Sequence, residues 1–219
     1  MELEKLEGYQ RFVTNDLVAE LEKYFPEGSS TLCGIVGGRR PSSYSLSPSL
    51  WNTAYRILKI DAVYIAFDVS VEPDHNNLIA FIDRLVGDDR FRVLSITDPY
   101  KQTVLQHLNT RGEVDGVARQ IGAVNTIIRT EAGLCGYNTD GVGMARNLSS
   151  VIDLKEGRVL QLGAGGAGRA IAHGLTERMG NGVYYLLNRT VSRAKELAAS
   201  LERADHRLEI RPLGGAADR

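Results

Sequence analysis

Residues 163–168 place three glycines in the spacing G-x-G-x-x-G, after the apolar run "RVLQL" and before a helical pattern. In such a loop the first glycine permits a tight turn, the second lets the backbone approach a pyrophosphate, and the third lets helix and strand pack closely. The helix N-terminus adds N–H donors and the positive end of the helix dipole. The spacing therefore predicts a dinucleotide-binding loop made of Gly163, Ala164, Gly165, Gly166, Ala167 and Gly168.

The residues after the next strand-like run indicate which dinucleotide binds. NAD-binding domains usually carry a carboxylate there, about 20 residues after the loop, for the ribose 2′-hydroxyl. This chain instead has Asn188, Arg189 and Thr190, with Arg193 one turn later. Two guanidinium groups suit a 2′-phosphate, so the sequence favours NADP(H) as cofactor. The structural alternative is a helix capped by Thr190, with a solvated arginine beside it.

Lys101 and Asp140 are candidates for acid–base chemistry. Lys101 lies in the first turn of a helix expected to start at Pro99, where a cation faces the positive end of the dipole. A lysine at this position does little for helix stability, whereas a proton-transfer group would benefit from it. The alternative is that Lys101 is simply a solvated surface residue. Asp140 belongs to "NTDGVG", where Thr139 or Asp140 could equally cap a helix.

Strand-like and helix-like runs alternate along the chain, which predicts an α/β fold with a mainly parallel sheet. A hairpin is expected within residues 123–140, turning at "EAG". The expected strands are residues 31–38, 62–69, 91–97, 158–163, 182–188 and 208–214. The expected helices lie at residues 14–24, 48–58, 78–85, 169–179 and 190–204, with one more starting at residue 99. Two domains are expected, divided around residues 148–157.

The composition is that of an ordinary globular protein, with 43% hydrophobic residues, 24% charged residues and a net charge of −1. This balance gives no general attraction to nucleic acid or to an anionic membrane. The N-terminus is charged where a signal peptide would be apolar, and no apolar run approaches membrane-spanning length. Two distant cysteines and four scattered histidines indicate a reducing compartment and no metal site. We expect a cytoplasmic protein.

Five signatures occur in one order, namely "SYSLSPSLWNTAY", "SITDPYK", "IGAVNT" with "GYNTDGVG", "LGAGGAGRA" and "NRT". In order and spacing they resemble the shikimate dehydrogenase family, over about residues 31–215. The resemblance implies a substrate-binding, catalytic domain at residues 31–150 and a partial Rossmann-type NADP-binding domain at residues 151–219, after an N-terminal extension of residues 1–30. It also implies the reduction of 3-dehydroshikimate to shikimate by NADPH, in aromatic amino-acid biosynthesis.

The resemblance also implies roles for the polar residues. The substrate ligands would be Ser45, Ser47, Thr97, Asn125 and Asp140. The two serines correspond to a pair that hydrogen-bonds the substrate carboxylate, a task that suits hydroxyl donors. Lys101 would protonate the developing alkoxide, while Asp140 would orient the reacting hydroxyl. Thr139 would then cap the helix that follows. From the residues alone, Ser47 could also cap a helix ahead of Pro48, and both roles can hold at once, while Asn125 could be a turn residue.

Two departures from the family pattern bear on these roles. Ser95 stands where the family commonly has asparagine, so a substrate hydrogen bond is lost or passes through water. Only three strands are expected after Gly157, whereas a full dinucleotide-binding domain has six. Strand 158–162 would then be an unpaired edge, covered by a second copy or by a missing C-terminal segment. Because "GYQRFVTNDLVAELEKYF" resembles the end of a dehydroquinase domain, we expect a piece of a longer or fused polypeptide.

Three alternatives to a shikimate dehydrogenase stay open. A quinate or related dehydrogenase would differ in substrate or cofactor preference. A ligand-binding regulator of the same fold would lack catalysis, although Lys101 and Asp140 together favour an enzyme. A general NADP-binding scaffold would leave the motifs before residue 150 unexplained.

Overall fold

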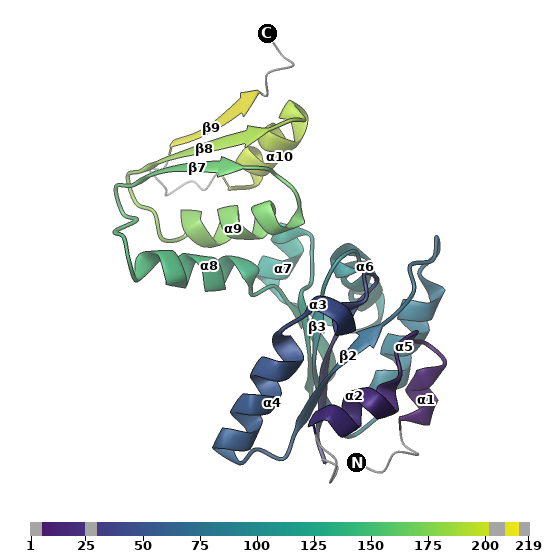
Figure 1. Cartoon of the computed structure of the whole chain (residues 1–219). Helices are drawn as coiled ribbons and strands as arrows, with labels where there is room; N and C mark the ends of the chain where they lie inside the picture. The colour runs from purple at the N-terminus through teal and green to yellow at the C-terminus, as the bar shows by residue number, and fades with distance from the viewer. Residues whose placement is uncertain (1–5, 25–29, 202–208, 215–219) are drawn as a thin grey trace. The chain divides into compact units, whose positions relative to one another are not determined.

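The computed structural model describes three stretches of the chain, residues 6–24, 30–201 and 209–214 (Figure 1). They form two compact units, each of which combines strands with helices, so the expected α/β class is confirmed. Within the described residues, no helix is both long and apolar enough to cross a membrane. The same residues hold no group of three or more histidine, cysteine or acidic side chains that could bind a metal ion.

The division between the units differs from the expected one. The first unit comprises Met1–Arg119 and Ala123–Tyr137, and the second comprises Gln120–Gly122 and Asn138–Arg219. The boundary therefore precedes the helix at residues 140–149, which the sequence pattern assigns to the first domain. Residues 6–24 also belong to the first unit, whereas the sequence favours a separate extension over residues 1–30.

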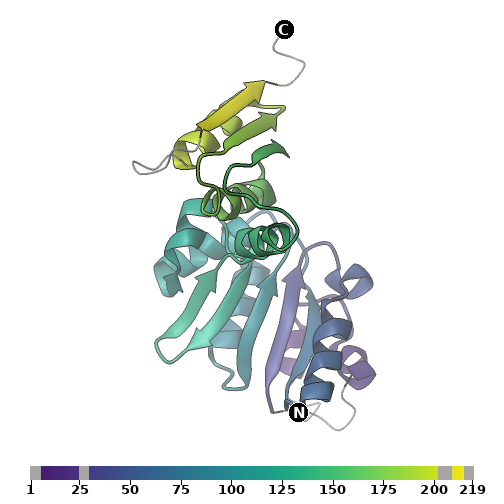
Figure 2. The same ribbon diagram turned by 90° about the vertical axis from the view of Figure 1, so that its left-hand side faces the viewer.

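The first unit is built on a six-stranded sheet of order β2-β1-β3-β5-β6-β4. Strands β2, β1 and β3 are parallel, as the alternating pattern predicts, and the hairpin β5–β6 adds antiparallel to β3 (Figure 2). The short strand β4 pairs parallel with β6. The strands are β1 (Leu32–Gly37), β2 (Val63–Asp68), β3 (Phe91–Ile96), β4 (Glu113–Val114), β5 (Thr126–Thr130) and β6 (Gly133–Tyr137).

Side chains of β1 and β2 alternate between two hydrophobic clusters, because successive residues of a strand point to opposite faces. The larger cluster contains Val63, Ile65 and Phe67, and the smaller one contains Tyr64 and Ala66. Helices α5 and α6 contribute to the larger cluster, and Tyr55 of α4 packs against the smaller one. The helices of this unit are α1 (Glu7–Gln10), α2 (Leu17–Tyr24), α3 (Pro41–Tyr44), α4 (Ser47–Leu58), α5 (Asn76–Val86) and α6 (Lys101–Arg111), and α7 (Gly116–Ile121) crosses the boundary between the units.

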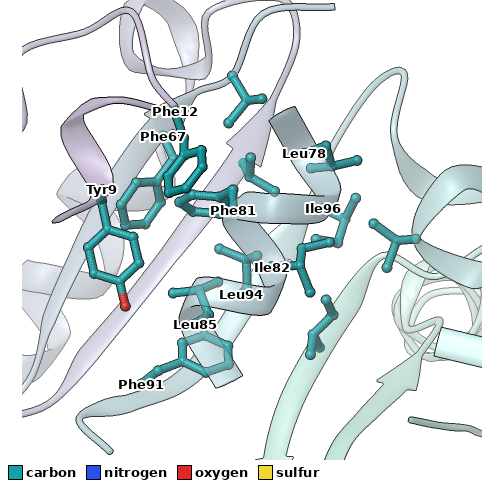
Figure 3. Close-up of a cluster of buried hydrophobic side chains, with 14 of the residues drawn as sticks. Tyr9, Phe12, Phe67, Leu78, Phe81, Ile82, Leu85, Phe91, Leu94 and Ile96 are labelled. Carbon is teal, nitrogen blue, oxygen red and sulfur yellow. The ribbon is translucent and has the colours of Figure 1, made fainter. Parts of the chain in front are cut away.

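The N-terminal segment is part of this core. Tyr9 packs against Phe67 and Phe81, with ring centroids 6.2 and 5.9 Å apart, and Phe12 lies 6.3 Å from Phe81 (Figure 3). Tyr9 is fully buried, and its hydroxyl donates to Asp88 at 2.8 Å. Burial of large aromatic rings explains why these residues join the first unit.

Strand β2 lies at the edge of the sheet, and asparagine side chains bond its outward backbone groups. Asn15 donates to the carbonyl of Ala66 at 2.9 Å and accepts from the amide of Asp68 at 3.0 Å. Asn52 of α4 donates to the carbonyl of Tyr64 at 2.7 Å and accepts from its amide at 2.8 Å. Both asparagines thereby replace a neighbouring strand, and Asn52 also holds α4 against the sheet.

Asp88 makes the stability of the first unit depend on pH. Burial raises the pKa of Asp88, but hydrogen bonds from Arg90 and Tyr9 outweigh it and lower the pKa from 3.8 to about 2. The ionised carboxylate therefore stabilises the fold above about pH 4, and this contribution is lost as the pH falls toward 2. We expect Asp88→Asn to cost about 2 kcal/mol of unfolding free energy at pH 7 and much less near pH 2, measured by urea unfolding. An equal cost at both pH values would contradict this assignment.

The second unit contains a three-stranded parallel sheet of order β7-β8-β9. Its strands are β7 (Arg158–Leu162), β8 (Val183–Asn188) and β9 (Glu209–Gly214), and its helices are α8 (Asp140–Ser149), α9 (Gly166–Thr176) and α10 (Val191–Leu201). Tyr184 and Leu186 of β8 are buried in a cluster with residues of α9 and α10. On β7, Leu160 is 60% exposed and Leu162 is 73% exposed. Within the described part of the chain, β7 pairs only with β8.

Two glycines explain why α8 belongs to the second unit. Gly141 of α8 and Gly174 of α9 lie backbone to backbone, and α8 and α9 run side by side (Figure 1). A Cβ atom on Gly141 would overlap the carbonyl of Ala170, and one on Gly174 would overlap the carbonyl of Gly141. The guanidinium of Arg169 also donates to the carbonyl of Ile121 at 3.0 Å, which explains why the end of α7 joins this unit.

Candidate functional site

Polar residues of the first unit follow the carboxyl ends of its parallel strands. Helices α3 and α4 follow β1, and Lys101 is the first residue of α6 after β3. Asn125 lies beside the end of β3, where its carbonyl accepts from the amide of Ile96 at 2.7 Å. The sheet therefore brings five of the expected site residues to one end of its strands, namely Ser45, Ser47, Thr97, Lys101 and Asn125. Ligands of open α/β sheets bind at this end.

Ser45 and Ser47 are coupled by a hydrogen bond. The amide of Ser47 donates to Oγ of Ser45 at 3.2 Å, and both side chains are half-buried. Ser47 is the first residue of α4, and Leu46 occupies the N-cap position without a side-chain hydrogen bond. The alternative that Ser47 caps this helix is therefore wrong, because the hydroxyl of Ser45 accepts the first amide instead.

The loop that carries the two serines is held by Asp68 at the end of β2. Asp68 is 2% exposed, and its carboxylate accepts from the amide of Ser42 at 2.9 Å and from the Ser42 hydroxyl. Charge-assisted hydrogen bonds of this kind are stronger than neutral ones. They fix the position of α3 and hence of Ser45, one residue beyond its end.

The segment after β3 is packed closely against the end of β1. The amide of Thr97 donates to the carbonyl of Val36 at 3.0 Å, and a Cβ atom on Gly37 would overlap the Thr97 side chain. The peptide bond between Asp98 and Pro99 is cis. Helix α6 begins after it, at Lys101, two residues later than expected. Lys101 is half-buried in the first turn, as the sequence predicts.

Asn125 is a buried residue of the sheet. It is 8% exposed, its amide donates to the carbonyl of Tyr137 at 2.9 Å, and its Oδ1 accepts from the Thr126 hydroxyl at 2.9 Å. These contacts place it directly before β5, between the ends of β3 and β6. The alternative that Asn125 is a turn residue is wrong, because its backbone continues the ladder of hydrogen bonds.

Tyr64 is a site residue that the sequence did not reveal. Its hydroxyl donates to Oγ of Ser95 at 2.7 Å. Burial raises the pKa of Tyr64 to about 12, although the hydrogen bond with Ser95 acts in the opposite direction. The phenol is therefore protonated at neutral pH. Strand alternation could have placed Tyr64 on the face of α4, but not beside Ser95.

The glycine loop of the second unit has the geometry that its spacing predicts. Gly163 has a φ of +100°, and a Cβ atom on Gly168 would overlap the Gly163 carbonyl. A Cβ atom on Gly165 would meet no described atom within 4 Å, so this position leaves room for a ligand. Gln161, which the sequence did not reveal, donates to the carbonyls of Gly163 at 2.7 Å and Gly168 at 3.0 Å. Tyr184 in turn donates to Gln161 at 2.6 Å.

Asn188 joins the glycine loop to the end of β8. Its Oδ1 accepts from the amide of Ala164 at 3.1 Å, and its Nδ2 donates to the carbonyl of Thr190 at 2.7 Å. Arg189 and Arg193 are exposed on either side of the start of α10. Amides at the start of α9 and these two guanidinium groups are suitable donors for phosphate oxygens.

Asp140 opens helix α8 in the second unit. Thr139 occupies the N-cap position but its side chain makes no capping hydrogen bond, so the expected capping by Thr139 is wrong. The side chain of Asn138 takes that role for one amide, because its Oδ1 accepts from the amide of Asp140 at 3.2 Å. A carboxylate at this end of a helix is favoured by the helix dipole.

Sequence comparisons identify relatives of this chain. Residues 38–127 match the family model of the shikimate dehydrogenase substrate binding domain. The NADP(+) shikimate dehydrogenase of Bacillus anthracis (strain CDC 684 / NRRL 3495) is 40% identical over 181 residues, which cover 82% of this chain and 61% of that enzyme. The chain thus spans less than two thirds of the length of the curated relatives that it matches.

Structure comparisons agree with the sequence. Shikimate 5-dehydrogenase from Thermus thermophilus, solved with NADP(H) and shikimate, has 34% identity and a TM-score of 0.65, over 83% of this chain and 63% of that one. Quinate dehydrogenase from Corynebacterium glutamicum, solved with NAD, has 29% identity and a TM-score of 0.69, over 86% of this chain and 64% of that one.

The two sheets, their polar ends and the glycine loop define a Rossmann-type α/β protein. Within this class, the chain resembles the shikimate dehydrogenase family, whose substrate binding domain its residues 38–127 match. The resemblance inferred from its five signatures is therefore confirmed.

Proposed function

We propose that this chain acts as an NADP-dependent shikimate dehydrogenase, which interconverts 3-dehydroshikimate and shikimate. One observation carries the proposal: a chain 40% identical to an NADP(+) shikimate dehydrogenase has a lysine as the first residue of α6, at the same end of the sheet as the two serines and Asn125. The relative from Thermus thermophilus, solved with NADP(H) and shikimate, supports the same substrate and cofactor class.

The first unit would hold the substrate. Ser45 and Ser47 would donate to its carboxylate, and Thr97 and Asn125 would bind its ring hydroxyls. Hydroxyl and amide donors suit this task because they bind oxygen without a second full charge to desolvate. Lys101 would give a proton to the alkoxide oxygen during reduction and would accept it in the reverse direction. Asp140 is the candidate for orienting the reacting hydroxyl.

The second unit would hold the cofactor. The amides of the glycine loop would bind the pyrophosphate, and Arg189 and Arg193 would bind the 2′-phosphate. When bound, NADPH supplies the hydride for reduction of the ring ketone. Gln161 and Asn188 keep the loop in shape through their hydrogen bonds to its backbone.

The arginine assignment predicts a change in cofactor preference. We expect Arg189→Ala to weaken NADP⁺ binding about tenfold and to leave NAD⁺ binding unchanged, because only the 2′-phosphate loses a charged partner. Calorimetric titration of both dinucleotides measures this, with Arg178→Ala as an exposed control in the same unit. Equal weakening for both dinucleotides would show that Arg189 does not select the phosphate.

The function itself is tested by near-UV absorbance of NADP⁺ mixed with shikimate and the 219-residue chain. Formation of NADPH supports the proposal. If no NADPH forms, calorimetric titration with shikimate separates two cases. Binding would show that the first unit is intact but the chain does not turn over, and no binding would show that the substrate assignment is wrong.

Quinate is the second candidate substrate. The observations that favour it are Ser95, which replaces the family's common asparagine, and the likeness to the quinate dehydrogenase of Corynebacterium glutamicum. Faster turnover with quinate than with shikimate would show that quinate is the preferred substrate.

A further inference from the structure

The side chain of Tyr64 extends across the first sheet, toward the carboxyl ends of its parallel strands. It lies on β2, while Ser95 lies on β3, and β1 separates these strands. In the register of the sheet Tyr64 is opposite Cys33, whereas Ser95 is opposite Ile35. The ring therefore reaches across β1 and toward the carboxyl ends of the strands before its hydroxyl meets Ser95.

Helix α4 holds both the backbone and the ring of Tyr64. Asn52 bonds both backbone groups of Tyr64, as described above. Trp51 stacks on the phenol ring, with centroids 6.2 Å apart and an angle of 21° between the planes. With only 2% of its surface exposed, the ring cannot turn elsewhere without disrupting this packing.

The contacts also determine where hydroxyl protons point. The phenol has one proton, which it donates to Ser95, so the proton of Ser95 can be donated to another group. Ser95 lies on the same face of the chain as Thr97 two residues later. A buried aromatic hydroxyl thus orients a serine that lies two residues before an expected substrate ligand.

We propose that Tyr64 is a positioning residue for substrate binding: it holds the hydroxyl of Ser95 so that Ser95 can donate to a bound hydroxylated carboxylic acid. The inference rests on the proposed function, because it assigns Tyr64 to the same site. It adds Ser95 as a ligand and Tyr64 as the group that orients it.

Calorimetric titration of the 219-residue chain with shikimate tests the proposal. Tyr64→Phe removes only the hydroxyl and keeps the ring, and we expect it to raise the dissociation constant about five- to tenfold. Tyr55→Phe is the matched control, because it removes a hydroxyl from a ring that also packs on Trp51. We expect its dissociation constant to stay within about twofold of the original.

Coupling to Ser95 separates positioning from a general structural effect. Ser95→Ala is expected to weaken shikimate binding to a similar degree, and the double variant Tyr64→Phe/Ser95→Ala no further, because both changes break one interaction. NADP⁺ binding and the emission of Trp51, the only tryptophan, should be unchanged in Tyr64→Phe.

Each other result overturns the proposal in a distinct way. Unchanged shikimate binding by Tyr64→Phe, or losses that simply add in the double variant, would refute the role of Tyr64 while the proposed function stands. If the original chain binds no shikimate, the proposal and the proposed function fail together.

Discussion

We expect that replacing Lys101 with alanine will lower the rate of NADPH formation from NADP⁺ and shikimate about a thousandfold, while shikimate will still bind. General acid–base catalysis contributes about 10²–10⁴-fold to enzymatic rates, and Lys101 is the one basic residue among the candidate substrate ligands. Lys101 suits the role because it is half-buried in the first turn of α6, at the same sheet end as the two serines.

Two further variants separate proton transfer from charge. Lys101→Arg keeps the positive charge but stays protonated, so it should be nearly as inactive as Lys101→Ala. Lys155→Ala removes an exposed lysine of the second unit and should leave the rate unchanged. A Lys101→Arg variant with close to full activity would show that the charge, and not the proton, matters at this position.

The second large effect is expected at the contact between α8 and α9. Gly174→Ala would place a methyl group into the backbone of Gly141, and a backbone atom cannot move aside as a flexible side chain can. We expect a loss of about 2–3 kcal/mol of stability in the second unit. The loss also concerns the site, because Gly141 directly follows Asp140.

The matched control is Gly143→Ala, on the same helix α8. A Cβ atom there would meet no described atom within 4 Å, so alanine should stabilise the helix by about 0.5–1 kcal/mol. Thermal unfolding measures both variants. Trp51 fluorescence follows the first unit, whereas far-ultraviolet circular dichroism follows both. If Gly174→Ala unfolds at the original temperature in both signals, the close packing of α8 on α9 is refuted.

Local patterns in the sequence are sufficient to predict most helices and strands and the glycine loop. Strand alternation and glycine spacing act over a few residues, so they predict β1, β2, β3 and the turn at Gly163 without knowledge of the fold. The placement of Lys101 in a first helical turn is equally local. Helix ends are less well determined by such patterns, and the starts of α6 and α4 differ from the expected ones by one or two residues.

Contacts between distant segments could not be predicted in this way. Tyr9 and Phe12 bury their rings against Phe67 and Phe81, and nothing near the N-terminus indicates that partner. The link between Tyr64 and Ser95 depends on strand order, since β1 lies between them. The domain boundary depends on one close approach between two helices, which a single glycine in each sequence segment does not reveal.

The hydrogen bonds at the edge of β2 also affect whether another molecule can pair with this strand. An open strand edge is a template on which another chain can add a strand and start an aggregate. Asn15 and Asn52 bond outward groups of Ala66, Asp68 and Tyr64, so a second molecule finds these groups already occupied. The two asparagine side chains therefore also make this edge a poor template for a further strand.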